Sequence, residues 1–246
     1  MFAIYKKELR SYFLNAIGYV YLGVFLAAAA VISGLTTLMQ NSYDTASYFT
    51  MIIYTFIILI PLLTMKLFSE EKKLRTEQLL LTAPVSIPAM ILGKYFAAMT
   101  LFGGSLAVSL VNLFPLYAYK AVESSSLNGV HYGPLTAQIA GCFIGVLLIG
   151  AAFVAIGMFI SSLTENQLAA AVATIAVIVV MLVLDVVNTY IDSYALRSVI
   201  NWVCIISRFA NFASGLLDFA AMLYYASLAT VFLLLTGRVY ERRRWA

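Results

Sequence analysis

Charge is scarce in this sequence. Only 11% of its 246 residues are Asp, Glu, Lys or Arg, whereas 63% are hydrophobic. Soluble domains carry about 25% charged residues and about half apolar ones. A water-soluble core of this length would leave too much apolar surface exposed. The composition therefore excludes an ordinary soluble domain and predicts a chain whose solvent is the lipid bilayer.

Cysteine and histidine are also rare. Cys142 and Cys204 lack a C-x-x-C or Cys/His spacing, and the single histidine, His131, falls in a predicted loop. These residues give no support to a disulfide framework or a zinc site. The dipeptide Gly93-Lys94 lacks the flanking residues of a phosphate-binding loop, and no hydrolase motif occurs. We expect no catalytic, cofactor-binding or metal-binding residues, and no ATP hydrolysis by the chain itself.

Long apolar runs are abundant. Six of them are long enough to cross the roughly 30 Å hydrocarbon core as helices. They cover residues 16–38, 47–65, 95–118, 135–160, 168–187 and 219–237. We therefore predict an all-α polytopic membrane protein with six transmembrane helices, forming one domain over residues 1–246. Gly141 and Gly145 have the G-x-x-x-G spacing that permits close helix approach, which we interpret as packing.

Residues 1–15 precede the first apolar run. They carry Lys6, Lys7 and Arg10 among aromatic and apolar residues at helical spacing, a pattern typical of an interfacial helix. A signal peptide is the competing interpretation, because basic residues precede an apolar run. The charge-free run 16–38 exceeds the about 7–15 apolar residues of a signal peptide, so we favour a retained first span.

The longest polar interruption lies between the second and third runs. Seven charged residues occur from Lys66 to Glu77, with leucines and a phenylalanine among them. This pattern predicts a short amphipathic helix. Pro84 ends it, and Ser86 with Pro88 opens the next helix. The segment is either a solvated loop that contains a helix, or a docking element that passes movement from a soluble partner to the spans.

Residues 188–218 are too polar for a span and too apolar for a plain loop. They predict helices that dip back into the membrane under protein cover, or that lie at its surface. Asp185 is the main charge inside a span. We interpret it as the partner of a helix end or of the re-entrant segment, rather than as a proton relay, with Arg197 or Arg208 as a candidate partner. We expect Lys94, at the edge of the third run, to extend to the interface.

The basic residues predict the orientation. With the N-terminus inside, the inner segments hold twelve of the fifteen Lys and Arg residues, and the outer segments hold Lys120, Arg197 and Arg208. The positive-inside rule then gives two cytoplasmic termini. The net charge of +4 is accordingly a topology signal, and we expect no nucleic-acid partner.

The polar segment resembles the cytoplasmic coupling segment of ABC-2 type transporter permeases. The residues that match that pattern are Glu70, Glu71, Lys72, Lys73, Thr76, Glu77, Leu79, Leu80, Leu81 and Pro84, followed by Gly93 and Lys94. One position departs, because Arg75 stands where the pattern has glycine. Residues 6–20 resemble the elbow helix and first span of these permeases. Residues 207–218, with Arg208, Gly215 and Asp218, resemble the re-entrant stretch before their last span.

The set is similar in particular to the permease subunit of gliding-motility ABC systems and to related nitrous-oxide-reductase accessory permeases. The resemblance implies a pair of permeases, identical or different, over two cytoplasmic ABC ATPase subunits that bind ATP and Mg²⁺. It implies an exporter in the bacterial inner membrane, and it allows an extracytoplasmic or accessory subunit as a further partner. The residues implied in ATPase coupling are Glu70, Glu71, Lys72, Lys73, Thr76, Glu77 and Pro84. Arg208, Gly215 and Asp218 lie in the stretch that resembles the re-entrant segment. With Asp185 and Arg197, they are our candidates for an outer gate or re-entrant segment.

Two other function classes stay open. A membrane scaffold would anchor a peripheral complex through the same polar segment without moving anything. An ion-coupled secondary carrier would need ionisable residues within its spans, and the sequence has few there. We therefore expect an ATP-driven permease.

Overall fold

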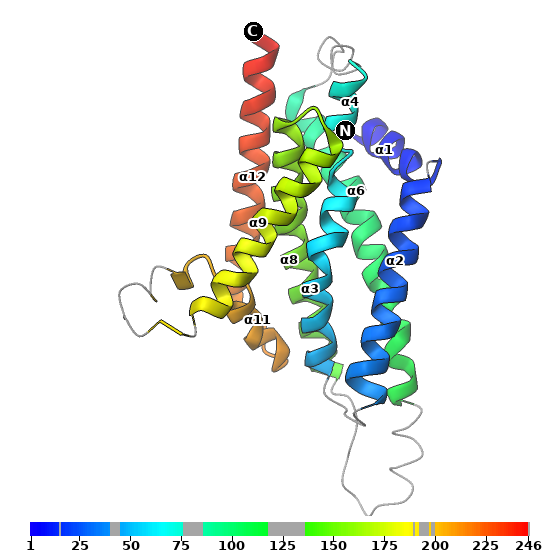
Figure 1. Cartoon of the computed structure of the whole chain (residues 1–246), viewed down its shortest axis with the longest axis vertical. Coiled ribbons are helices and arrows are strands. Elements are labelled where there is room, and N and C mark those ends of the chain that lie inside the picture. Colours follow the sequence, from blue (N-terminus) through cyan, green and yellow to red (C-terminus); the bar gives the residue numbers. More distant parts are fainter. Residues whose placement is uncertain are drawn as a thin grey trace, which may run out of the picture.

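The computed structural model describes residues 1–14, 16–39, 45–75, 86–117, 136–188, 190–191, 197 and 200–245. Every secondary-structure element in these ranges is a helix (Figure 1). Six helices are long and apolar enough to cross a membrane, which confirms the predicted all-α, six-span fold. They cover Ala16–Thr37, Thr45–Lys73, Ile87–Tyr117, Thr136–Leu163, Gln167–Asn188 and Phe219–Arg244.

The elements follow one another in a simple order. The long helices are α2 (Ala16–Ser33, continued by the π-helical turn η1, Gly34–Leu38), α3 (Thr45–Thr64), α6 (Ile87–Ser109, continued by the 3₁₀ turn η2, Leu110–Leu113), α8 (Thr136–Leu163), α9 (Gln167–Asn188) and α12 (Phe219–Trp245). The short helices are α1 (Phe2–Leu14), α4 (Ser69–Lys73) and α11 (Ile206–Ala213).

Helix α8 is the centre of the bundle. It contacts α3, α6, α9, α11 and α12, and glycines let its neighbours approach closely. A Cβ on Gly150 would lie 2.1 Å from the Phe102 ring, and a Cβ on Gly157 would lie 2.4 Å from Oγ1 of Thr64. The predicted packing pair, Gly141 and Gly145, lies against α11 in the same manner. Small side chains on α8 therefore set its spacing from α3, α6 and α11.

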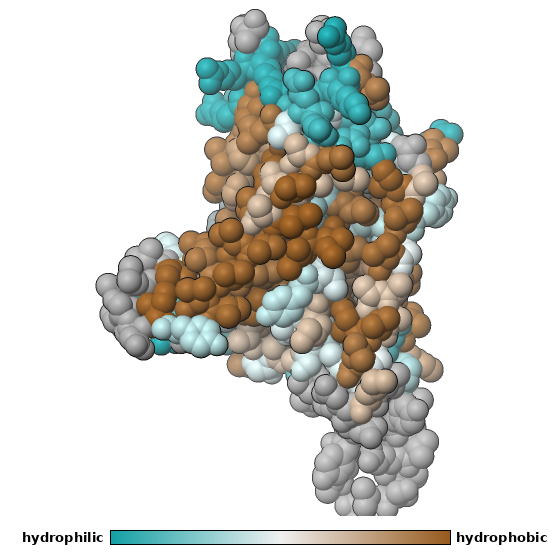
Figure 2. Space-filling view, in the orientation of Figure 1, coloured by the Kyte–Doolittle hydropathy of each residue, from teal (hydrophilic) through white to brown (hydrophobic). Residues whose placement is uncertain are grey.

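The molecule has one strongly hydrophilic end. Figure 2 shows hydrophilic residues gathered above a broad hydrophobic belt. Figure 1 places α1, α4 and both chain termini at that same end. Helix α1 contacts α2 and α6 there, and α11 lies near the opposite end. A membrane protein with an even number of spans has both termini on the same side of the membrane, as this arrangement does.

Two helices extend beyond their predicted spans. The third span begins at Ile87 rather than near Tyr95. Ser86 is extended just before α6 and Pro88 lies in its first turn, as the sequence predicts. Helix α12 continues to Trp245, so the basic tail is helical. The predicted amphipathic helix is described only as the five-residue α4, and the predicted stop at Pro84 lies outside the described residues.

Candidate functional site

The polar segment is fastened to the end of α8. The hydroxyl oxygen of Ser161 accepts the backbone N–H groups of Phe68 and Ser69, both at 3.2 Å. These are donors at the start of α4 that have no intrahelical partner. The Lys72 ammonium donates to the backbone carbonyl of Ser162. The end of α8 thus caps the start of α4 and also binds a side chain from its last turn.

A buried lysine lies beneath the polar segment. Lys94 of α6 is 1% exposed, and its Nζ lies 3.0 Å from Glu8 Oε1 and 2.8 Å from Glu71 Oε1. It also donates to the Leu67 carbonyl at 2.8 Å and lies 5.2 Å from the centroid of the Phe68 ring. An ammonium has three donors, and here each one has an oxygen partner.

We name Lys94, Glu8, Glu71 and Lys7 the Lys94 cluster. Lys7 Nζ lies 3.6 Å from Glu8 and 3.5 Å from Glu71, so two ammonium groups balance two carboxylates. Burying a charge costs several kcal/mol unless it is well paired. The cluster therefore joins α1, the polar segment and α6, which come from distant parts of the sequence.

The expectation that Lys94 extends to the membrane interface is wrong. Because α6 begins at Ile87, Lys94 lies about two turns inside the helix. Its side chain faces the protein, where Glu8 and Glu71 neutralise it. Glu8 was not singled out from the sequence. The one available signal was an isolated acidic residue on an otherwise basic interfacial helix.

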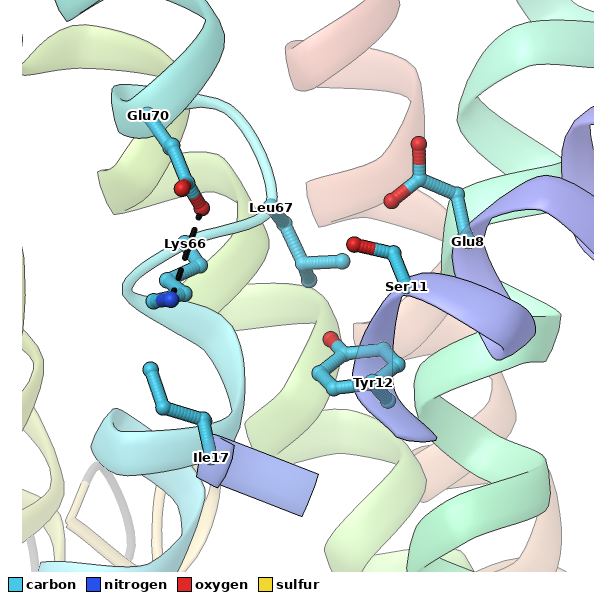
Figure 3. Close-up of a pocket in the computed structure, with 7 residues that line it drawn as sticks. All are labelled: Glu8, Ser11, Tyr12, Ile17, Lys66, Leu67 and Glu70. Carbon is cyan, nitrogen blue, oxygen red and sulfur yellow. Dashed lines mark ion pairs between the residues drawn. The ribbon is translucent and has the colours of Figure 1, made fainter. Parts of the chain in front are cut away.

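A small cavity of about 30 Å³ separates α1 from the polar segment, enough for about one water molecule. Figure 3 shows the Lys66–Glu70 ion pair (3.7 Å) on one side and α1 on the other. The residues that line it are Glu8, Ser11, Tyr12, Ile17, Lys66, Leu67 and Glu70. Tyr12 donates to the Leu63 carbonyl at 3.0 Å. Burial, with the nearby Glu8 carboxylate, raises the Tyr12 pKa above its ordinary value, so Tyr12 remains a neutral donor.

Residues 73–75 form an exposed tip. Leu74 is 63% exposed, and both flanking cations, Lys73 and Arg75, are exposed. Arg75 has a φ of +56°, a left-handed conformation at the end of α4 that favours glycine. Its N–H donates to the Lys72 carbonyl at 3.0 Å. The glycine-type backbone turn is therefore present although the residue is arginine.

The predicted coupling residues divide into inward-facing and outward-facing groups. Glu71 and Lys72 point into the molecule, where they bind Lys94 and α8. The Glu70 side chain is 34% exposed beside Lys66, and Lys73 faces outward. Thr76, Glu77 and Pro84 lie outside the described residues.

Asp185, at the opposite end of the bundle, caps α11. Its carboxylate accepts three backbone N–H groups, those of Ile205 (2.8 Å), Ile206 (2.9 Å) and Ser207 (3.1 Å). The prediction of a helix-end role is confirmed. Among the described residues, neither Arg197 nor Arg208, the predicted partners, forms an ion pair with Asp185. The Arg208 guanidinium lies 4.2 Å from the Tyr224 ring centroid and donates to the Asn201 carbonyl, and Arg197 is exposed.

Gly215 and Asp218 define the turn from α11 to α12. Gly215 has a φ of +82°, and the Leu216 N–H donates to the Asn211 carbonyl at 3.0 Å, which closes α11 with a glycine cap. Asp218 accepts N–H groups from the first turn of α12 and the side-chain amide of Asn211 at 2.7 Å. The Asn211 amide and these N–H groups lower the pKa of Asp218.

Comparison with known proteins gives one family match. A family model described as "ABC-2 family transporter protein" matches residues 11–239. The matched range contains the polar segment, α11 and nearly all of the six spans, and it leaves out the first ten residues. A search of curated proteins found no match.

Proposed function

Because the chain belongs to the ABC-2 transporter family, we propose that it is the permease subunit of an exporter driven by a separate cytoplasmic ATPase. The observation that carries the proposal is the attachment of the polar segment. Ser161 and Ser162 hold it on α8, and the Lys94 cluster holds it on α6 and α1. A force on its exposed tip would reach three helices at once.

In this mechanism the tip docks on the ATPase. Leu74 offers an exposed apolar contact between the cations Lys73 and Arg75. Glu70 lies beside the tip, and Thr76, Glu77 and Pro84 follow it in sequence. The partner would bind ATP and Mg²⁺ and, as it closes, favour one arrangement of the permease helices over another. Such a population shift needs contacts that differ between the two states.

Glu71 and Lys72 act within the permease in this proposal. The Glu71 side chain is 15% exposed and binds both lysines of the Lys94 cluster. Its role is to carry movement from α4 to α6. Lys72 does the same between α4 and α8 through the Ser162 carbonyl.

The hydrophilic end faces the cytoplasm in this proposal, and the protein resides in the bacterial inner membrane. Support comes from the basic residues. Both termini lie at this end, with the basic residues of α1, the polar segment and the last turns of α12. Lys and Arg are enriched on the cytoplasmic side of membrane proteins.

The capped helix α11 lies near the other end and is the proposed outer gate. Asp185, Gly215 and Asp218 set where α11 begins, where it ends and where α12 follows. Arg208 joins α11 to α12 through the Tyr224 ring. Arg197 precedes α11 in the same outer segment.

The working unit in this proposal holds two permeases, either two copies of this chain or this chain with a second permease. An accessory membrane or extracytoplasmic subunit is compatible with it. Within the family we propose the gliding-motility-type subgroup, on the resemblance of the polar segment, residues 6–20 and residues 207–218 taken together. That subgroup assignment does not identify the cargo.

Leu74→Asp tests the docking step. A charge at this apolar contact should reduce recovery of the ATPase at least tenfold when the tagged chain is purified in mild detergent. The partner is identified by its Walker motifs, and its ATP hydrolysis is measured in the complex. Reversal of Glu70 and Glu71 is a poorer test, because Glu71 also supports the Lys94 cluster.

Leu216→Asp is the matched control. Leu216 is as exposed as Leu74, at 65%, and belongs to the turn between α11 and α12, so the variant should retain the ATPase. Undiminished ATPase recovery with Leu74→Asp would contradict docking at the tip. If the ATPase binds but hydrolyses ATP at the same rate with and without the permease, the scaffold interpretation would be favoured.

A further inference from the structure

Helix α1 has two chemically different faces. Its inner face carries the buried residues Ile4 and Tyr12 and the Glu8 carboxylate, which binds Lys94. On its outer face lies an open groove of about 630 Å³. The residues that line this groove are Ala3, Lys6, Lys7, Arg10, Ser11 and Leu14. The outer face therefore gathers all three cations of the helix.

Two of these three cations lack an acidic partner. Within the described chain, Lys6 and Arg10 have no acidic side chain within 4 Å, whereas Lys7 pairs with Glu8 and Glu71. Lys66, Lys94 and Arg238 at the same end are also paired. Like charges at i and i+4 on a helix repel each other. An anion in the groove would relieve that repulsion.

Apolar side chains flank the groove. Phe2, Phe13 and Leu14 are all exposed, and Phe13 packs edge-on against Tyr19 in the first turns of α2. Since α2 is the first span, Phe13 and Leu14 lie where the bilayer boundary begins. A basic helix with exposed apolar anchors at that depth is suited to phospholipid headgroups.

We propose that the outer face of α1 binds the headgroup of an anionic phospholipid through Lys6, Lys7 and Arg10. Arginine can bind a phosphate with two parallel hydrogen bonds, and the lysines add point charges. The exposed Phe2 and Leu14 would contact the acyl chains. The three cations precede residue 11, where the family match begins.

The site is connected to the polar segment through one residue. Lys7 faces the groove and also lies 3.5 Å from Glu71 and 3.6 Å from Glu8. A bound headgroup would compete for Lys7, leaving Lys94 as the main partner of both carboxylates. Lipid charge at the membrane surface would in this way adjust the Lys94 cluster.

The test compares lipid binding by the full-length chain and two matched variants. Delipidated protein in a non-ionic detergent is titrated with phosphatidylglycerol or with phosphatidylcholine of the same acyl chains, and bound lipid is counted by native mass spectrometry. We expect the wild type to prefer phosphatidylglycerol and to lose that preference at high salt. Lys6→Gln/Arg10→Gln should weaken phosphatidylglycerol binding on the order of tenfold or more. Lys7 stays unchanged so that the Lys94 cluster is preserved.

Arg242→Gln/Arg244→Gln is the control. It also removes two exposed cations, but from the end of α12, which extends past α1 in Figure 1, and it should bind phosphatidylglycerol as the wild type does. The proposal fails if Lys6→Gln/Arg10→Gln retains wild-type binding, or if the control loses as much. It also fails if inorganic phosphate at the lipid concentration displaces the lipid, because a free-phosphate site needs no acyl chain.

Discussion

The two ends of the molecule satisfy their partly buried carboxylates in different ways. At the hydrophilic end, Glu8 and Glu71 are neutralised by Lys94, a side chain from another helix. At the opposite end, Asp185 accepts three backbone N–H groups at the start of α11. The first arrangement includes a pair of residues 86 apart in sequence, Glu8 and Lys94. The second joins residues 20 to 22 apart.

The difference bears on which end can rearrange. The backbone fixes the three amides that bind Asp185, so the cap holds α11 in one position. The Lys94 cluster consists of flexible side chains, and both Lys94 and Lys7 reach the same two carboxylates. Partners can therefore be exchanged without leaving a charge unpaired. The cluster suits an element that moves, and the cap suits one that is held.

Replacing Lys94 with methionine should have the largest effect. The change leaves Glu8 and Glu71 largely buried beside each other, with only the exposed Lys7 to balance them. Breaking a buried ion pair in this way costs about 3–5 kcal/mol. The measurement is the free energy of unfolding in detergent.

The triple variant Lys94→Met/Glu8→Gln/Glu71→Gln is the control, because it removes all three charges together. It should regain most of the lost stability, since replacing a whole buried ion pair is often neutral. A Lys94→Met protein as stable as the wild type would show that the cluster is solvated and that the contrast between the two ends is mistaken.

Replacing Asp185 with alanine should have the second largest effect. Three N–H groups, one of them buried and two part-buried, would lose their acceptor. The cost is about 1–3 kcal/mol, and the start of α11 should loosen. Cys204 reports on this region, because it is fully buried and lies next to Ile205. Burial, with Asp185 nearby, raises the pKa of its thiol to about 11. The wild-type thiol is therefore protonated and shielded near neutral pH, and maleimide labelling should be slow.

Asp185→Ala should increase that labelling at least tenfold in a Cys142→Ala background, since exposure and a lower thiol pKa act in the same direction. Asp218→Ala is the comparison, because Asp218 caps α12 from an exposed position. It should leave Cys204 slow to label. Equal labelling of all three proteins would mean that the Asp185 cap does not hold α11.

The six spans could be predicted because apolar runs of sufficient length have few alternatives in lipid. Asp185 could be assigned to a helix end because it lies at the border of such a run. The Lys94 cluster could not be predicted, because Lys94 and Glu8 lie 86 residues apart and only tertiary packing brings them together. Ser86 and Pro88 did predict where α6 begins, but the third span was placed near Tyr95 for the same reason. A lysine paired inside the protein does not end a span.

The two ends also differ in the residue that takes up a positive φ after a short helix. Helix α11 ends with Gly215 at a φ of +82°, and α4 ends with Arg75 at +56°. The sequence pattern calls for glycine at position 75, and the backbone has kept the conformation that glycine favours. A side chain in the left-handed region costs about 1–2 kcal/mol. The polar segment therefore carries a strain that α11 avoids.

Arg75→Gly should give the smallest effect, a stabilisation of about 1 kcal/mol, because it relieves this strain and the exposed arginine makes no ion pair among the described residues. Arg75→Ala is the control, since it removes the same charge but keeps the strained backbone, and it should be no more stable than the wild type. The measurement is the free energy of unfolding in detergent for all three proteins. If alanine stabilises as much as glycine, the gain comes from removing charge at the tip. The two helix ends then share a backbone conformation, but Arg75 carries no strain that glycine relieves. If glycine alone stabilises and the ATPase partner still binds, the turn is set by its backbone, and docking does not require the arginine side chain.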